Sequence, residues 1–486
     1  MSVTNFRPLP PRKVFVESLT RRWRAKHYQP DQTLPRIPLR MHVMQMVCAA
    51  AISLLDAPHA TKDAIRSALF PFAGLAVGKT QNEHDRTIDF NNITTHAQEI
   101  EYADPNKATL VLGGIECSKT KTRLLSMTGK EFYIAEIRSE SGAFNGITVP
   151  MLAGIGNSAE GFFHNNLIPF LLGLGCHIIL IDQPGIAKNL HYETEKPRVM
   201  ALVDEILPVV CKYLADKKYN VHWVAYSQGG MTFKIFKAKF EKCIHENPRF
   251  ADTVKSSNCL GSPYLILANA HPLYAIILGL SELLKHSSSI RKWLPAVPYQ
   301  KLLEIIGDEW YKIDFDSLLI GNHWGLSLIS SEKNPSFNKA QSAECMRNGF
   351  KPIPTKELLW YVERSRLGSL PYLNEGLATV AADQLDVDIS GVEDPLSRAH
   401  TLDYMYDLTN FSSSIFGLTP KTKVIVDTTS ARHKTALQDV KDGYTHLGIV
   451  IHASHMDLVF HPGVREIIKA SIDARLARLA AANGMA

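Results

Sequence analysis

The sequence predicts an α/β fold, with a mostly parallel central sheet, helices on both faces, a large helical cap insertion and an N-terminal helical extension. Three observations lead to this prediction. From about Lys107, short apolar runs alternate with helical patterns, which indicates βαβ units and a parallel sheet. The alternation stops between Pro263 and about Pro420, and the first 105 residues lack it.

The elements follow in order along the chain. Strands are expected at 109–112, 132–137, 148–153, 177–181, 221–225, 256–260, 423–426 and 448–451. Helices are expected at 39–75, 159–174, 196–217, 229–245 and 464–481. The chain thereby divides into a basic arm and helical extension, a first core part, a helical cap and a second core part, at 1–105, 106–263, 264–420 and 421–486.

Composition limits the classes of function. With 486 residues, 45% of them hydrophobic and 21% charged, the chain is typical of a globular protein with a buried core. The net charge of +5 is small for this length and predicts no nucleic-acid partner.

Positive charge gathers in residues 1–40, where arginine and lysine far outnumber the two acids Glu17 and Asp31. This arm either lies solvated on the body of the protein or docks on an anionic membrane surface or an acidic partner.

The cysteines and apolar segments predict a cytoplasmic location. Seven cysteines are scattered and form no CxxC pair, which is typical of reduced core thiols and of neither a disulfide framework nor a zinc site. No signal segment opens the chain, and the apolar stretch 43–55 is shorter than the roughly 20 residues that span a bilayer. There is no HExxH motif, so we expect no metal and no cofactor.

The strongest chemical motif follows the predicted strand 221–225. A Tyr-Ser-Gln-Gly-Gly run places Ser227 at the apex of a strand, a turn and a helix. Such a turn lifts the hydroxyl to where a base can reach it. Ala225 and Gly229 provide the small residues that let the strand and the helix pass closely. On a simpler interpretation, Ser227 is an ordinary helix-capping residue.

This elbow resembles that of the α/β-hydrolase superfamily, and its Ser-Gln-Gly-Gly run is similar to those of lipases and esterases. The resemblance covers 148–230 and 423–465, about half of the chain. It implies Ser227 as a nucleophile that forms an acyl-enzyme, with an acid and then a histidine base further along the chain.

The resemblance also implies an oxyanion site in the turn after the strand 148–153. Many such hydrolases carry a His-Gly-x turn there, and here Ala153 stands at the histidine position. The backbone N–H of Ile155 then falls at the donor position, and the second N–H belongs to Gln228.

The same turn has a rival interpretation. Gly154-x-Gly156-x-x-Ala159 lies between a strand and a helix, and Asp182 follows the next strand. This pattern is a dinucleotide fingerprint, and it would make the protein a nicotinamide enzyme. Against it, Asp182 begins a loop similar to the Asp-x-Pro-Gly loop of the hydrolases, and the strand after that leads to the serine elbow.

The base is expected after the last strand, 448–451. His455 lies clear of that strand, and its His-x-Asp-apolar context is similar to that of certain acid lipases. His452 and His461 are the nearby alternatives.

The acid that should orient the histidine does not appear where the resemblance implies it. The resemblance implies a Gly-x-x-Asp turn after the penultimate strand, and none follows 423–426. Asp427, at the end of that strand, is the candidate, with Asp439 and Asp442 as alternatives from the next helix. A missing acid would weaken the enzyme without necessarily abolishing catalysis, because the acid orients the imidazole and stabilises the imidazolium. The gap also leaves open a non-catalytic binding protein on the same fold.

These observations predict a serine hydrolase that acts on an ester or thioester with a hydrophobic acyl group. An acyltransferase, a nicotinamide oxidoreductase and a non-catalytic binding protein are the alternatives. The cap would wall the pocket, and its apolar runs 272–278 and 302–306 either line an acyl-chain site or form the core of the cap. The sequence makes no prediction of oligomeric state.

Overall fold

The computed structural model describes most of the predicted core. The described residues are 88–100, 109–163, 166–264, 296–297, 353–354, 356–357, 360–361, 370, 385–391, 394, 423–427, 437–438, 440, 446–482 and 484. The basic arm, the predicted helix 39–75 and the apolar runs of the predicted cap lie outside these residues.

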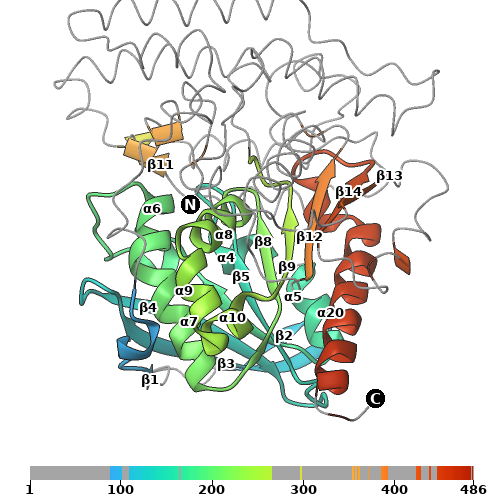
Figure 1. The fold of residues 1–486 in the computed structure, drawn as a ribbon, viewed down its shortest axis with the longest axis horizontal. Helices are drawn as coiled ribbons and strands as arrows, with labels where there is room; N and C mark the ends of the chain where they lie inside the picture. Colours follow the sequence, from blue (N-terminus) through green and yellow to red (C-terminus); the bar gives the residue numbers. More distant parts are fainter. Residues whose placement is uncertain are drawn as a thin grey trace, which may run out of the picture.

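A mixed sheet forms the centre of the described part (Figure 1). Its strands are β1 (Gln98–Ile100), β2 (Thr109–Leu112), β3 (Ile115–Leu125), β4 (Glu131–Ser139), β5 (Ile147–Leu152), β6 (His177–Ile181), β7 (Asn220–Val221), β8 (Trp223–Tyr226), β9 (Ser256–Leu260), β12 (Leu385–Gly391), β13 (Lys423–Asp427) and β14 (His446–Ile451). A separate pair joins β10 (Ala296–Val297) to β11 (Ile353–Pro354).

The strand order is β1-β3-β4-β6-β5-β8-β9-β12-β14-β13, with β2 beside β3 and β7 beside β5. All pairs from β6 to β13 are parallel, whereas the pairs among β1, β2, β3, β4 and β6 are antiparallel. Because the carboxyl ends of parallel strands meet at one edge, the loops after β5, β8, β9, β12 and β14 converge there.

Helices cover both faces of the sheet. They are α4 (Ala159–Phe163), α5 (Leu167–Gly173), α6 (Arg198–Ala201), α7 (Leu207–Asp216), α8 (Gln228–Lys239), α9 (Glu241–Glu246), α10 (Pro248–Val254), α19 (Asp457–Phe460) and α20 (Pro462–Ala482). Single turns of 3₁₀-helix stand at Phe90–Asn92 and Ala187–Asn189, and a π-helical turn (Leu202–Ile206) joins α6 to α7.

Two apolar cores follow from the alternation of side chains along the strands. In β8, Trp223 and Ala225 pack into one core, while Val224 and Tyr226 pack into the other. The first core lies under α6–α10, grouped on one side of the sheet in Figure 1, and the second lies under α4, α5, α19 and α20. The predicted fold class, a mostly parallel sheet with helices on both faces, is thereby confirmed.

Most predicted elements match the structure closely. The strands 109–112, 177–181 and 256–260 have the predicted bounds, and the predicted strand 221–225 is divided into β7 and β8. The predicted helix 159–174 is divided into α4 and α5.

Five of the described strands were not predicted: the short strands β1, β10 and β11, and the two longer strands β3 and β12. In β3, the residues from Ser118 to Arg123 are all polar, and all of them except Thr122 are only partly buried. The strand β12 lies inside the range 264–420, which the sequence analysis assigned to a cap, yet it pairs with β9 and β14 in the central sheet. Asp386 and Asp388 interrupt its apolar pattern, and for this reason the segment did not look like a buried strand.

Three further observations concern the described residues alone. None of their helices has the length and apolar character needed to cross a membrane. They contain no group of three or more His, Cys, Asp or Glu side chains that could hold a metal ion. Their cysteines are buried free thiols, and burial raises the pKa of Cys211 to about 12, so that this thiol stays protonated.

Candidate active site

The turn between β8 and α8 has the shape of a nucleophile elbow. Ser227 adopts φ 52° and ψ −120°, a conformation that costs free energy in a residue with a side chain. Its N–H donates to the carbonyl oxygen of Leu260 at 2.8 Å, which ties the elbow to the end of β9. A Cβ at Gly229 would overlap the carbonyl of Leu152 in β5, so this position requires glycine, as the sequence indicated.

His455 lies against this serine. It follows β14, and its Nε2 lies 2.9 Å from the Ser227 hydroxyl oxygen. The ring of Tyr226 packs near the imidazole, with 5.1 Å between centroids, and the Tyr226 hydroxyl donates to the backbone carbonyl of His455 at 3.3 Å. The structure therefore brings together the two residues that the sequence predicted as nucleophile and base.

The two alternative histidines lie elsewhere. His452 is exposed directly after β14. His461 uses its Nδ1 to accept the N–H of Gly463 at 3.0 Å, at the start of α20.

The acid at this histidine is Asp394, which the sequence analysis did not consider. Its Oδ2 lies 2.7 Å from Nδ1 of His455, and its side chain is fully buried. Because a carboxylate can only accept, Nδ1 donates to Asp394 and Nε2 is left to accept the Ser227 hydroxyl proton. The missing acid, which motivated the non-catalytic interpretation, is thus supplied by a carboxylate within hydrogen-bond distance.

The predicted acid Asp427 stands in a different strand. It ends β13, the strand beyond β14, whereas Asp394 follows β12, the strand between β9 and β14. Asp439 and Asp442 lie outside the described residues. The expected Gly-x-x-Asp turn does exist, at 391–394, after a strand that the sequence analysis placed in the cap. Recognising β12 would therefore have identified Asp394.

Glycines allow the three loops to meet. A Cβ at Gly391 would overlap the carbonyl of Ala453, in the loop that carries His455. Gly261, after β9, has φ 55°, and a Cβ there would lie 3.2 Å from both Asp394 Oδ2 and His455 Nδ1. The pair of imidazole and carboxylate is consequently packed against backbone that carries no side chain.

The predicted oxyanion turn faces the serine. A Cβ at Gly154 would lie 3.1 Å from the Cβ of Ser227, so the turn after β5 packs directly on the elbow. Ile155 is the next residue of that turn, and Gln228 is the first residue of α8, where N–H groups have no acceptor within the helix. The two predicted donors thus belong to segments that adjoin the nucleophile.

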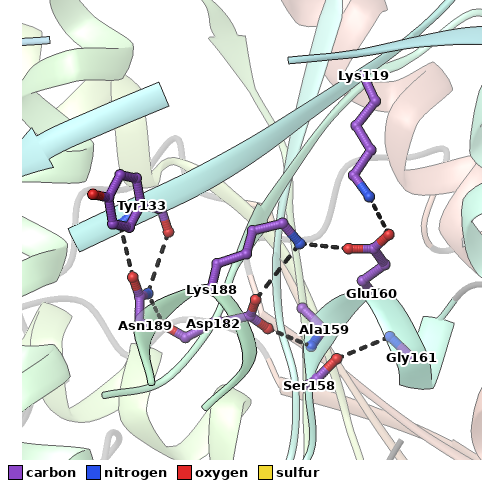
Figure 2. A network of polar contacts seen from close by, with 9 residues as sticks. All are labelled: Lys119, Tyr133, Ser158, Ala159, Glu160, Gly161, Asp182, Lys188 and Asn189. Atoms are coloured by element: carbon purple, nitrogen blue, oxygen red, sulfur yellow. Dashed lines mark hydrogen bonds and ion pairs between the residues drawn. The ribbon is translucent and has the colours of Figure 1, made fainter. Parts of the chain in front are cut away.

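Asp182, which the dinucleotide interpretation assigns to a ribose, is bound inside the protein (Figure 2). Its buried carboxylate accepts the N–H of Ala159 at 2.8 Å, at the start of α4, and burial raises its pKa. Lys188 lies 3.9 Å from it and also pairs with Glu160. Asp182 therefore anchors α4 beside the oxyanion turn, and the fingerprint lacks a carboxylate directed at a ligand.

Glu160 belongs to the same network. Burial alone would raise its pKa, but the ammonium groups of Lys188 and Lys119 outweigh this effect and lower the pKa to about 2. The carboxylate is therefore ionised at neutral pH and joins α4 to β3 and to the loop after β6.

The similarity of this chain to known proteins is a similarity of structure. No family model matches the chain, and no curated protein sequence matches it. The structure is similar to a putative non-heme bromoperoxidase from Mycobacterium tuberculosis H37Rv, with 14% identity, 70% of this chain and 96% of the other covered, and a TM-score of 0.40.

Two further solved structures are similar over comparable lengths. One is a soluble variant of monoglyceride lipase from Saccharomyces cerevisiae, with 12% identity, coverage of 80% and 98%, and a TM-score of 0.40. The other is a carboxyl esterase from Bacillus coagulans, with 14% identity, coverage of 76% and 98%, and a TM-score of 0.42. The serine elbow between a strand and a helix, and the chain order Ser, Asp, His, are typical of the α/β-hydrolase fold.

Proposed function

We propose that this protein is a serine hydrolase that cleaves an ester or thioester through an acyl-enzyme on Ser227. One observation carries the proposal: the Ser227 hydroxyl, the His455 imidazole and the Asp394 carboxylate lie in one hydrogen-bonded line, at 2.9 and 2.7 Å. All three are buried where the carboxyl ends of parallel strands converge. An ordinary helix-capping serine needs neither the strained backbone of Ser227 nor an imidazole directed at its hydroxyl.

In the proposed mechanism each of the three groups has its own task. His455 Nε2 takes the proton of Ser227 as the hydroxyl oxygen attacks the carbonyl carbon of the substrate. The resulting imidazolium donates to Asp394, which also holds the ring in the required tautomer. The tetrahedral intermediate then expels an alcohol or a thiol, which His455 protonates. Water attacks the acyl-enzyme with His455 as the base, and the carboxylic acid is released.

The oxyanion is assigned to the backbone N–H groups of Ile155 and Gln228. Both stand beside the nucleophile, one in the turn that packs on Ser227 and one at the N-terminus of α8. The helix N-terminus adds partial positive charge, which favours an anion. The hydrophobic acyl group is proposed from the apolar runs 272–278 and 302–306 of the sequence.

A fluorophosphonate probe tests the proposal, because it reacts with an activated serine. Wild-type protein is expected to be labelled, Ser227→Ala to lose all labelling, and Ser141→Ala, at an exposed serine, to keep it. Folded wild-type protein that takes no label would overturn the hydrolase proposal.

A series of p-nitrophenyl esters tests the acyl group. We expect a higher kcat/KM for decanoate than for acetate, and the opposite order would remove the hydrophobic acyl group while leaving the hydrolase in place.

A further inference from the structure

A buried amide stands behind the turn that carries Ile155. Gln183, in the loop after β6, is 2% exposed, and its Nε2 donates to the carbonyl oxygen of Gly154 at 2.7 Å. The carbonyl oxygen of Ala153 lies 3.3 Å from the same nitrogen. The Gly154 carbonyl also accepts the N–H of Asn157 at 3.1 Å, so it is held from two sides.

The hydrogen bond from Gln183 to the Gly154 carbonyl also fixes the direction of a neighbouring N–H group. The C=O of Gly154 and the N–H of Ile155 belong to one planar peptide unit and point in opposite directions. A donor that holds the oxygen therefore sets the direction of the N–H. That N–H is one of the two groups assigned to the oxyanion.

The same amide also contacts the side chain of Gln228, the residue whose backbone N–H is the second assigned donor. The Oε1 of Gln228 lies 3.4 Å from Gln183 Nε2, and Gln228 Nε2 donates to Glu357. Glu357 is fully buried, and its other oxygen accepts the backbone N–H of Arg198 at 2.6 Å. A continuous line of buried polar groups thus connects the turn after β5, the start of α8 and the segment around residue 357.

We propose that Gln183 is a positioning residue that orients both oxyanion donors, Ile155 through the Gly154 carbonyl and Gln228 through its side chain. Glu357 holds the far end of this line. The inference rests on the proposed function. It predicts that loss of the Gln183 amide lowers the rate of the chemical step and leaves substrate binding almost unchanged, because a displaced oxyanion donor acts on the transition state alone.

Gln183→Met removes the amide at nearly the same volume. We expect kcat for ester hydrolysis and the rate of fluorophosphonate labelling to fall about 10- to 100-fold, less than the roughly 100- to 1000-fold for a donor lost outright. KM should change less than about twofold. Gln183→Asn shortens the side chain and keeps its polarity, and it provides a second test if the methionine variant fails to fold. A smaller fall in kcat, with KM again unchanged, is expected for it.

Asn145 supplies a matched control. It is a half-buried amide just before β5, at the end of this strand opposite to Gly154, and its Nδ2 donates to the carbonyl of Leu174 at 2.8 Å. Asn145→Leu removes a bond of the same kind, from an amide to a backbone carbonyl, at a place away from the proposed donors. It should lower Tm and leave kcat within about twofold of wild type.

The outcomes separate the inference from the proposed function. If wild-type protein is labelled and Ser227→Ala is not, the hydrolase stands. Folded Gln183→Met with wild-type kcat then overturns the inference alone, as does an equal loss of kcat in Asn145→Leu. If folded wild-type protein takes no label, the proposed function fails and the inference fails with it.

Discussion

Two buried strands, β5 and β12, lie on opposite sides of the pair β8–β9, and each leads into the candidate site. Every residue of both strands is buried. In β5 the residues are apolar except Thr148, and the strand ends next to the turn with Gly154. In β12 apolar residues alternate with Asp386, Asp388 and Ser390, and the strand leads to Asp394. One half of the site is thus built on an apolar strand and the other on a charged one.

The charged strand is neutralised by the helix that begins after the nucleophile. Lys237 of α8 lies 2.5 Å from Asp386, and Lys234 lies 3.3 Å from Asp388, with all four side chains buried. Nearby carboxylates raise the pKa of Lys234 well above its ordinary value despite its burial, so it remains charged. A buried charge is stable only with such a partner. The strand β5 is therefore stable in the core through its own apolar residues. The strand β12 depends instead on lysines of α8, about 150 positions away in the sequence.

The largest expected effect concerns the loop after β12. Asp394→Asn should lower kcat about 10,000-fold, because the amide no longer holds His455 in the tautomer that accepts the Ser227 proton. Steady-state kinetics on an ester substrate measures this loss, and circular dichroism checks the fold. Asp427→Asn, at the strand beyond β14, is the control and should retain kcat within about twofold. If Asp427→Asn loses activity and Asp394→Asn does not, the assignment of the acid to β12 is wrong.

The second prediction concerns the lysines that neutralise the buried aspartates of β12. Lys237→Met should lower the free energy of unfolding by about 1.5 to 3 kcal/mol, because Asp386 loses the nearer of its two buried cations and keeps only Lys234, at 3.5 Å. Urea denaturation measures it. The double variant Lys237→Met, Asp386→Asn removes both charges and keeps an acceptor for Ser257, whose hydroxyl donates to Asp386 at 2.6 Å. It should recover at least half of the loss. A single variant as stable as wild type would contradict the comparison.

The smallest effect is expected in β5. Met151→Leu should cost less than about 1.5 kcal/mol, because a buried apolar position tolerates another apolar side chain of similar volume. The same urea denaturation applies. A loss as large as that of Lys237→Met would mean that β5 is no more tolerant than β12, and the distinction between the strands would disappear.

The pattern of successes and errors in the sequence analysis follows the same distinction. The apolar strand β6 has the predicted bounds, and Ser227 and His455 were predicted because they follow the largely apolar strands β8 and β14. The polar strand β9 is an exception, because it too has the predicted bounds. Asp394 was missed because its strand carries aspartates, whose burial depends on Lys234 and Lys237. No local pattern shows that pairing. Gln183 was missed for a related reason, since its role depends on the carbonyl of Gly154, in a different loop.

The helix α8 has a consequence for how rigidly the reacting groups are spaced. It begins directly after Ser227, and two or three turns later its lysines hold β12, the strand that leads to Asp394. The hydroxyl and the carboxylate are therefore linked by two routes, one across the hydrogen bonds of β8, β9 and β12 and one along the helix axis. Because both routes connect the same two segments, a shift of one segment along the other would have to distort the sheet and the helix together. The spacing between Ser227 and Asp394 is therefore held more rigidly than either connection alone would hold it.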